Sequence, residues 1–247
     1  MSERSSTVPG MDIVLVPGLW LNASSWGRVV PHLEAAGHRA HPVTLPGLDS
    51  PDTDRSGIEV KDHVEHVVAV IDDLPDDAEV ALVGHSMGGA IAWAAADARP
   101  DRVRRVVFAA SEPVADGDGG SPPFPVEGSD VPLPEWSFFE GDPDEDMLAG
   151  MDDAMREEMR AGSVPSPVGV VRGTHRLHDE RRYDIPVTMV AAEYSSAQLK
   201  KWAAEGELPE LTRISDLEYV DLGGGHWPQY SQPEALAAVL VEALRPR

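Results

Sequence analysis

The sequence predicts a doubly wound α/β fold, in which a mainly parallel sheet of about six strands carries helices on both faces. Short apolar runs alternate with segments of helical period along most of the 247 residues, as is typical of parallel strands joined by crossover helices. One such run leads directly into Gly-His-Ser-Met-Gly at 84–88 and then into an Ala-rich helical segment. The alternation breaks between 113 and 183, which indicates an insertion into the sheet.

Each expected strand is a short apolar run that ends in loop or turn residues. These runs are 12–16, 39–44, 79–83, 103–110, 187–192 and 217–222. The expected helices between them have apolar residues at helical spacing or helix-ending Gly and Pro signals. They are 26–36, 58–74, 87–98, 196–205 and 233–244. Right-handed crossovers then bring all strand ends to one edge, where ligands bind in such sheets.

The insertion at 113–183 is expected to form a small lid over that edge. It opens with a Gly/Pro/Ser-rich loop, and helices are expected at about 145–160 and within 168–177. The sequence thus predicts one domain at 11–247, behind a flexible N-terminal tail at 1–10.

The composition excludes several classes of function. The chain has no cysteine, so thiolate nucleophiles, disulfides and Cys-based metal sites are excluded. A net charge of −23 disfavours nucleic acid and anionic membranes as partners, and no apolar run approaches the roughly 18 residues of a membrane span. We expect a cytoplasmic protein with a small-molecule substrate and without metal or cofactor. The oligomeric state is not predicted.

Ser86 lies at the apex of the strand–turn–helix formed by 79–98. This arrangement fits the nucleophile elbow G-x-S-x-G, in which the glycines let strand and helix pass closely around a strained serine. An ordinary Gly-rich turn is the alternative. The elbow predicts that Ser86 is a nucleophile.

Several loops resemble those of the α/β-hydrolase superfamily over about 11–245. Val14-Leu15-Val16-Pro17-Gly18 looks like the family's first core strand and the loop after it, where many members carry His-Gly. Leu45-Pro46-Gly47, the elbow and Gly225-His226-Trp227-Pro228 are similar to the family's Pro-Gly loop, nucleophile turn and late histidine loop. Among subgroups, the chain looks most like small lidded serine esterases and the related hydroxynitrile lyases.

The resemblance implies that His226 is the base that activates Ser86. A serine hydroxyl needs such a base within hydrogen-bond reach, and His226 is in the Gly-rich loop where the family carries it. The alternative is a loop histidine stacked on Trp227.

The sequence offers two main candidates for the acid of the triad, Glu193 and Glu112. Glu193 follows the fifth expected strand, near the family's usual acid position. Glu112 lies two residues past the fourth expected strand, where some members carry the acid instead. We favour Glu112 over Glu193, and Asp221 or no acid at all is the remaining alternative.

By position in the resemblance, the backbone N–H groups of Met87 and of Leu19 or Trp20 form the oxyanion hole. Apolar loop and lid residues beside the site are expected to contact substrate, together with His85. These substrate-binding candidates are Trp20, His85, Trp136, Phe138, Phe139 and Trp227.

The resemblance therefore implies a serine hydrolase that cleaves an ester, lactone or related acyl bond of a small, largely apolar substrate. A non-hydrolytic protein of the same fold is the alternative. It would be a lyase or cyclase that uses Ser86 and His226 as acid and base, or a ligand-binding protein with a degenerate triad.

Overall fold

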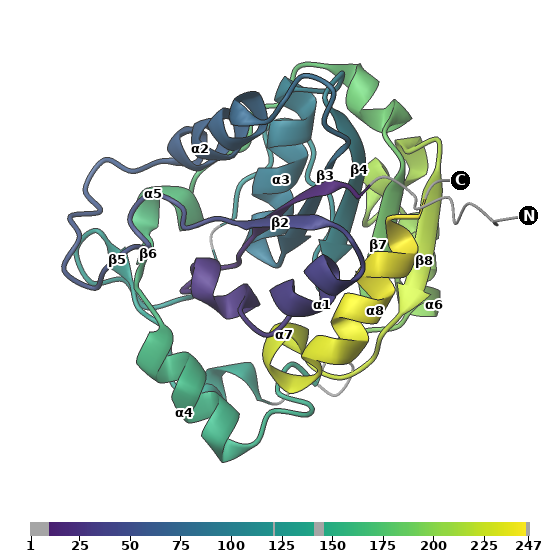
Figure 1. The fold of residues 1–247 in the computed structure, drawn as a ribbon. Coiled ribbons are helices and arrows are strands. Elements are labelled where there is room, and N and C mark those ends of the chain that lie inside the picture. The colour runs from purple at the N-terminus through teal and green to yellow at the C-terminus, as the bar shows by residue number, and fades with distance from the viewer. Residues whose placement is uncertain (1–9, 121, 141–145, 246–247) are drawn as a thin grey trace, which may run out of the picture.

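The computed structural model describes residues 10–120, 122–140 and 146–245, and its centre is a six-stranded parallel sheet (Figure 1). The strands are arranged in the order β2-β1-β3-β4-β7-β8. Their bounds are β1 Asp12–Val16, β2 Arg39–Pro42, β3 Val80–His85, β4 Val103–Ala109, β7 Val187–Ala191 and β8 Leu217–Asp221. The predicted fold class is confirmed, and the predicted strand ends differ by at most two residues.

Helices cover both faces of the sheet (Figure 1). α1 and α8 pack on one face with a core that includes Leu33 and Leu240. α2, α3 and α6 pack on the other face with a core that includes Ile71, Ile91 and Leu199. The bounds of the five helices are α1 Val30–Ala35, α2 Val60–Asp73, α3 Met87–Ala98, α6 Ser196–Glu205 and α8 Pro233–Ala243.

The helix expected at 26–36 is shorter than predicted. A 3-10 helix at Ala23–Trp26 comes first, and α1 begins only at Val30, with Pro31 in its first turn. Proline lacks the N–H that an earlier helical turn would require, so its place at the start of a helix is the favourable one.

α3 is buried on all sides, since ten of its twelve residues are buried. It packs on β3, on α2 and on the 3-10 helix Glu180–Asp184. The alanines and glycines of its sequence permit this close approach. The elbow helix is therefore fixed on every side.

The insertion between β4 and β7 carries only short elements. β5 (Asp130–Val131) and β6 (Ser166–Pro167) form a two-stranded antiparallel pair. The other elements are 3-10 helix Trp136–Phe139, α4 Asp153–Gly162, α5 Val168–Val171 and the 3-10 helix Glu180–Asp184. A short α7, Pro228–Ser231, precedes α8 outside the insertion, and a further 3-10 helix covers Pro209–Arg213.

The insertion helices differ from the prediction. α4 begins at Asp153 instead of about 145, because the Asp152 side chain accepts the N–H of Met155 and caps it there. Residue 145 lies outside the described residues, as does the predicted N-terminal tail apart from Gly10. α5 ends at Val171, so the helix expected within 168–177 is a single turn.

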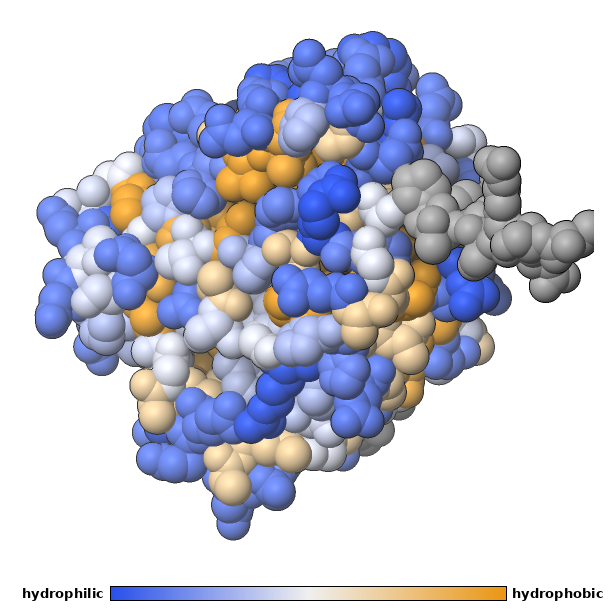
Figure 2. All heavy atoms as spheres, in the orientation of Figure 1, coloured by the Kyte–Doolittle hydropathy of each residue, from blue (hydrophilic) through white to orange (hydrophobic). Residues whose placement is uncertain are grey.

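Hydrophilic residues cover most of the face seen in Figure 2, and apolar residues gather between α2 and β2. In the part of the chain that the structure describes, no helix combines the length and the apolar character that crossing a membrane requires. The cytoplasmic location stays a prediction.

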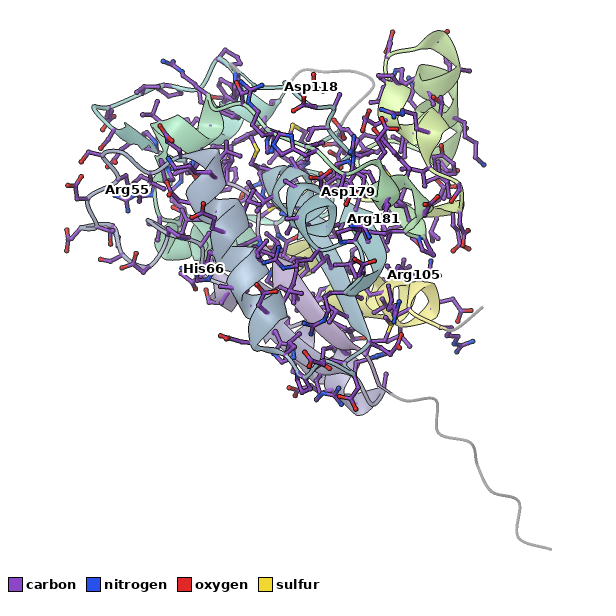
Figure 3. All side chains as sticks on the ribbon, turned by 90° about the horizontal axis from the view of Figure 1, so that it is seen from above. Arg55, His66, Arg105, Asp118, Asp179 and Arg181 are labelled. Atoms are coloured by element: carbon purple, nitrogen blue, oxygen red, sulfur yellow. The ribbon has the colours of Figure 1, made fainter. Side chains whose placement is uncertain are left out.

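A buried carboxylate ties the last part of the insertion to α3. Asp97 accepts the backbone N–H groups of His178 and Asp179, at 2.9 Å each, and an Nη1–H of Arg182 at 3.0 Å. The Asp97 and Arg182 side chains are 5% and 4% exposed. Asp179 also pairs with Arg181 on the same segment (Figure 3). Asp97 thus holds the insertion against the elbow helix.

Replacing Asp97 with alanine should destabilise the protein by about 3–5 kcal/mol, because Arg182 would keep a buried charge without this partner. Asp72→Ala is the matched control. It removes the Asp72–Arg99 pair, whose side chains are 44% and 39% exposed, and should cost no more than about 1 kcal/mol. Urea unfolding of both variants measures the difference, and equal losses would contradict a special role for the buried pair.

Candidate active site

Ser86 joins β3 to α3 in a backbone conformation that few residues other than glycine adopt, with φ 52° and ψ −131°. The glycines around it allow the close packing that this turn requires. A Cβ on Gly84 would lie 2.4 Å from the Cα of Gly89, and one on Gly88 would lie 2.4 Å from the carbonyl oxygen of Pro17. The structure therefore has the geometry of a nucleophile elbow.

Ser86, His226 and Glu193 form one chain of hydrogen bonds. The Nε2 of His226 lies 2.9 Å from the Oγ of Ser86, and its Nδ1 lies 2.6 Å from the Oε1 of Glu193. With Nδ1 protonated, His226 donates to the Glu193 carboxylate and accepts from the Ser86 hydroxyl. The Ser–His–carboxylate arrangement of nucleophilic catalysis is thus assembled.

The His226 loop is held from two sides. The N–H of His226 donates to the carbonyl of Met147 in the insertion at 2.8 Å. The Nε2–H of His85 donates to the carbonyl of His226 at 2.7 Å. A Cβ on Gly225 would lie 2.4 Å from the carbonyl oxygen of Met147, so this glycine permits the contact. The imidazole is therefore fixed by backbone contacts as well as by its own ring nitrogens.

The structure corrects the preference for Glu112, because the carboxylate at His226 Nδ1 is that of Glu193. The reason is the lateral order of the strands. His226 follows β8, whose neighbour is β7, and Glu193 comes two residues after β7 ends. Glu112 follows β4, one strand further away, and lines the cavity beside Ser86 instead. Asp221, the remaining alternative, accepts from the N–H and hydroxyl of Ser196.

The Glu193 carboxylate lies in a mostly dry setting, because its side chain is only 6% exposed. Burial acts to raise the pKa of the Glu193 carboxyl, but the charge and the hydrogen bond of His226 outweigh it. The pKa therefore lies below its ordinary value.

His85 directly precedes Ser86 and is buried against the His226 loop. Its ring is 1% exposed, and its Nδ1 accepts from the Nε2 of Gln229 at 3.3 Å. Burial, followed by the charge of His226, lowers the pKa of His85 to about 3. His85 is therefore a neutral group that holds the His226 loop.

The loop after β1 lies directly against the nucleophile. A Cβ on Gly18 would meet the Ser86 Cβ and the His85 Nδ1 at 2.9 Å, so glycine permits this approach. The N–H of Trp20 donates to the Oγ of Ser166 at 2.8 Å, which commits it outside the site. The backbone N–H of Leu19 is thus the candidate oxyanion donor that remains in this loop. The second predicted donor is the N–H of Met87 at the start of α3. Both oxyanion donors stay predictions.

A cavity of about 380 Å³ opens beside Ser86. Its lining residues come from the loops after β3, β4, β7 and β8, from α3, from the insertion, from α6 and from the segment after α6. They are Ser86, Met87, Ala90, Ala110, Ser111, Glu112, Val114, Met147, Glu193, Tyr194, Leu199, Trp202, Leu208 and His226. Among the described residues, no group of three or more His, Asp or Glu side chains is placed to hold a metal ion.

The six predicted substrate-binding side chains are not among these lining residues, and their contact with substrate stays a prediction. The insertion aromatics pack on one another instead, with ring centroids of Trp136 and Phe139 at 6.0 and 5.1 Å from Trp227. Trp20 packs edge-on to Phe139 at 5.9 Å, and Phe138 is 41% exposed. Edge-to-face pairs of this kind stabilise a core, so the rings form the interior of the insertion.

Comparison with known proteins places this geometry in a family. The model of the Alpha/beta hydrolase family matches residues 13–239. The chain belongs to the alpha/beta hydrolase family. The superfamily resemblance inferred from the elbow and the histidine loop is thus confirmed.

Relatives of this alpha/beta hydrolase include methylesterases of Arabidopsis thaliana. Methylesterase 7 is 27% identical over 93% of this chain and 94% of its own length. Methylesterase 8 is 38% identical over 44% of this chain, and the match spans only 40% of that relative's length. An extracellular alpha/beta-hydrolase from a Paenibacillus species has a TM-score of 0.75 at 21% identity, with 96% of this chain and all of that chain covered. A methylesterase structure from Arabidopsis has a TM-score of 0.69 at 19% identity, with 95% and 98% covered.

The residues that the sequence did not point to are the apolar walls of the cavity. Leu199 and Trp202 lie three residues apart on α6, and Tyr194 comes just before that helix. The i, i+3 spacing put both side chains on one helix face. It did not reveal that part of this face lines the cavity beside Ser86.

Two buried histidines should make the stability of this hydrolase depend on pH. Burial lowers the pKa of His63 to about 4, and that of His85 to about 3, from the ordinary value of 6.5. Each folded-state pKa is depressed, so protons bind the unfolded chain first as the pH falls below 6.5. Each group should cost about 2 kcal/mol of unfolding free energy between about pH 7 and pH 5.

The measurement compares urea unfolding of wild type and His63→Gln at both pH values. The variant should lose about 2 kcal/mol less than wild type on acidification. Identical pH dependence of the two proteins would show that His63 is not held neutral.

Proposed function

We propose that the protein is a serine hydrolase that cleaves the ester bond of a small, largely apolar substrate. The observation that carries the proposal is the hydrogen-bonded chain from Ser86 through His226 to Glu193. Its order and spacing are those that activate a serine for acyl transfer. Family membership and the relatives named methylesterases support an ester as the bond attacked.

In the first half of the reaction, Ser86 Oγ attacks the carbonyl carbon and His226 Nε2 takes the hydroxyl proton. Glu193 holds the imidazole in the required tautomer and stabilises its positive charge. The N–H groups of Leu19 and Met87 donate to the oxyanion of the tetrahedral intermediate. His226 then gives the proton to the leaving alcohol. Water repeats these steps on the acyl-enzyme and releases the acid.

The cavity supports a neutral apolar substrate. Aromatic and aliphatic side chains such as Trp202, Leu199 and Leu208 form much of its wall. Apart from His226, the charged groups among the described residues that line it are the carboxylates of Glu112 and Glu193. These carboxylates and the net charge of −23 disfavour substrates that carry a negative charge.

The ligand-binding alternative assumes a degenerate triad, in which no carboxylate pairs with His226. A buried carboxylate lies 2.6 Å from His226 Nδ1, and this distance argues against that alternative. Lyase or cyclase chemistry with the same Ser86–His226 pair differs from hydrolysis only in the steps after proton transfer, and substrate assays separate the two.

Labelling with a fluorophosphonate tests the nucleophile. Wild type should react covalently at Ser86, because the probe needs an activated serine and an oxyanion site. Ser86→Ala should show no labelling and no hydrolysis of short-chain nitrophenyl or methyl esters. Labelling of wild type without turnover of any ester would point to the lyase or cyclase alternative. Equal labelling of Ser86→Ala would overturn the proposal.

Replacing each carboxylate by its amide tests the acid. Glu193→Gln should lower kcat on an ester substrate by up to ~10⁴-fold, whereas Glu112→Gln should change it by less than about tenfold. The two variants are matched, because both remove one carboxylate from the cavity wall. A larger loss in Glu112→Gln would instead assign the role of the acid to Glu112. Circular dichroism spectra of both variants serve as the control for folding.

A further inference from the structure

Trp20 has an unusual backbone for a bulky residue, since its φ is 65°. Left-handed conformations of this kind are unfavourable for a bulky residue and persist only where the surroundings enforce them. Trp20 directly follows Leu19, whose N–H is the proposed oxyanion donor. The contacts that enforce the conformation of Trp20 therefore also position that donor.

Three hydrogen bonds hold Trp20, and all three partners belong to the insertion. Its N–H donates to the Oγ of Ser166 at 2.8 Å, and its indole Nε1–H donates to the carbonyl of Val131 at 3.0 Å. Its own carbonyl accepts the N–H of Val164 at 2.9 Å. The Trp20 side chain is almost fully buried, at 4% exposure, so these bonds are shielded from water.

The partners of Trp20 are themselves fixed. Val131 of β5 pairs with Ser166 of β6, so both hydrogen-bond acceptors sit on one antiparallel pair. Arg55, which is 1% exposed, donates from Nε to the carbonyl of Pro165 at 2.7 Å, and from Nη1 and Nη2 to the carbonyls of its own loop. Arg55 lies beside the insertion (Figure 3). The β5–β6 pair is thus anchored to the main domain.

The other side of the loop is fixed by the nucleophile. Gly18 approaches Ser86 so closely that a Cβ would lie 2.9 Å from the Ser86 Cβ. Both neighbours of Leu19 are therefore held in place. Gly18 packs against the elbow, and Trp20 is hydrogen-bonded to the β5–β6 pair. Oxyanion stabilisation depends on donors that are in place before the reaction begins.

We propose that Ser166 is a positioning residue for catalysis, which acts through Trp20 to hold the Leu19 N–H towards the oxyanion. The insertion then has a role beyond covering the site, because its β5–β6 pair sets the geometry of the loop that stabilises the transition state. This inference rests on the proposed serine hydrolase function.

The test is Ser166→Ala, which removes the acceptor of the Trp20 N–H. The expected result is a ~10- to 100-fold loss of kcat with KM within about twofold of wild type, because the donor serves the transition state and a small misplacement is costly. The matched control is Ser163→Ala, in the same insertion. The Ser163 hydroxyl donates to the carbonyl of Arg160, and this variant should keep wild-type kinetics.

A boronic acid inhibitor separates positioning from a general structural role. It forms a tetrahedral adduct on a catalytic serine and so mimics the transition state. In Ser166→Ala its affinity should fall by the same factor as kcat/KM. Trp20→Phe, which keeps an aromatic ring but removes the bond to Val131, should show a loss of the same kind and keeps the test open if Ser166→Ala fails to fold.

Unchanged kcat in Ser166→Ala, or a loss confined to KM with unchanged boronate affinity, overturns the inference. If wild type reacts with a fluorophosphonate and hydrolyses esters, either of these outcomes for Ser166→Ala contradicts this inference but leaves the proposed function intact. If wild type does neither, the proposed function fails and this inference fails with it.

Discussion

The backbone of Ser86 is the constraint on which the rest of the site depends. A residue at φ 52° is held there only by close neighbours. Its N–H donates to the carbonyl of Ala109 at 3.2 Å, and its carbonyl accepts from the N–H of Gly89 at 2.8 Å and from the hydroxyl of Ser111 at 2.6 Å. Because these partners lie at the end of β4 and in α3, the sheet and the elbow helix together fix the nucleophile.

The same kind of strain recurs on both sides of the nucleophile. Among the described residues, the non-glycine positions with positive φ are Trp20, Ser86 and Ala110. They follow β1, β3 and β4, which are three adjacent strands of the sheet. Strain that gathers at one place is characteristic of a site whose geometry is set in advance. The buried sheet and α3 supply the stability that keeps it there.

The sequence was sufficient for features that depend on local pattern. Alternating strands and helices predicted the layers, the glycines around Ser86 predicted the elbow, and the Gly-rich loop predicted the place of His226. The choice between Glu112 and Glu193 depended on lateral strand order, since β7 lies between β4 and β8. Nothing in a single strand's residues encodes its neighbour, so the sequence alone did not show that the carboxylate at His226 is that of Glu193.

The absence of the insertion aromatics from the cavity lining has a related reason. An aromatic ring can be buried against other rings or against a ligand, and the composition of a segment does not distinguish these two kinds of contact. Here Trp136, Phe139 and Trp227 satisfy one another. The tyrosine and tryptophan of the cavity wall come instead from the region after β7, where Trp202 packs edge-on to Tyr194 at 5.5 Å. Pairing of this kind emerges only from three-dimensional packing.

The cavity is linked directly to the chemistry, because Glu193 both lines the cavity and binds His226. The Glu193 side chain is only 6% exposed, and an apolar ligand that fills the cavity excludes water from its surroundings. Removal of water strengthens the attraction between opposite charges, and in the proposed mechanism His226 becomes positively charged only as Ser86 attacks. The benefit of a dry cavity therefore falls on the transition state more than on the resting enzyme. Apolar walls beside the acid can thus favour the reaction of an apolar substrate, and not only its binding.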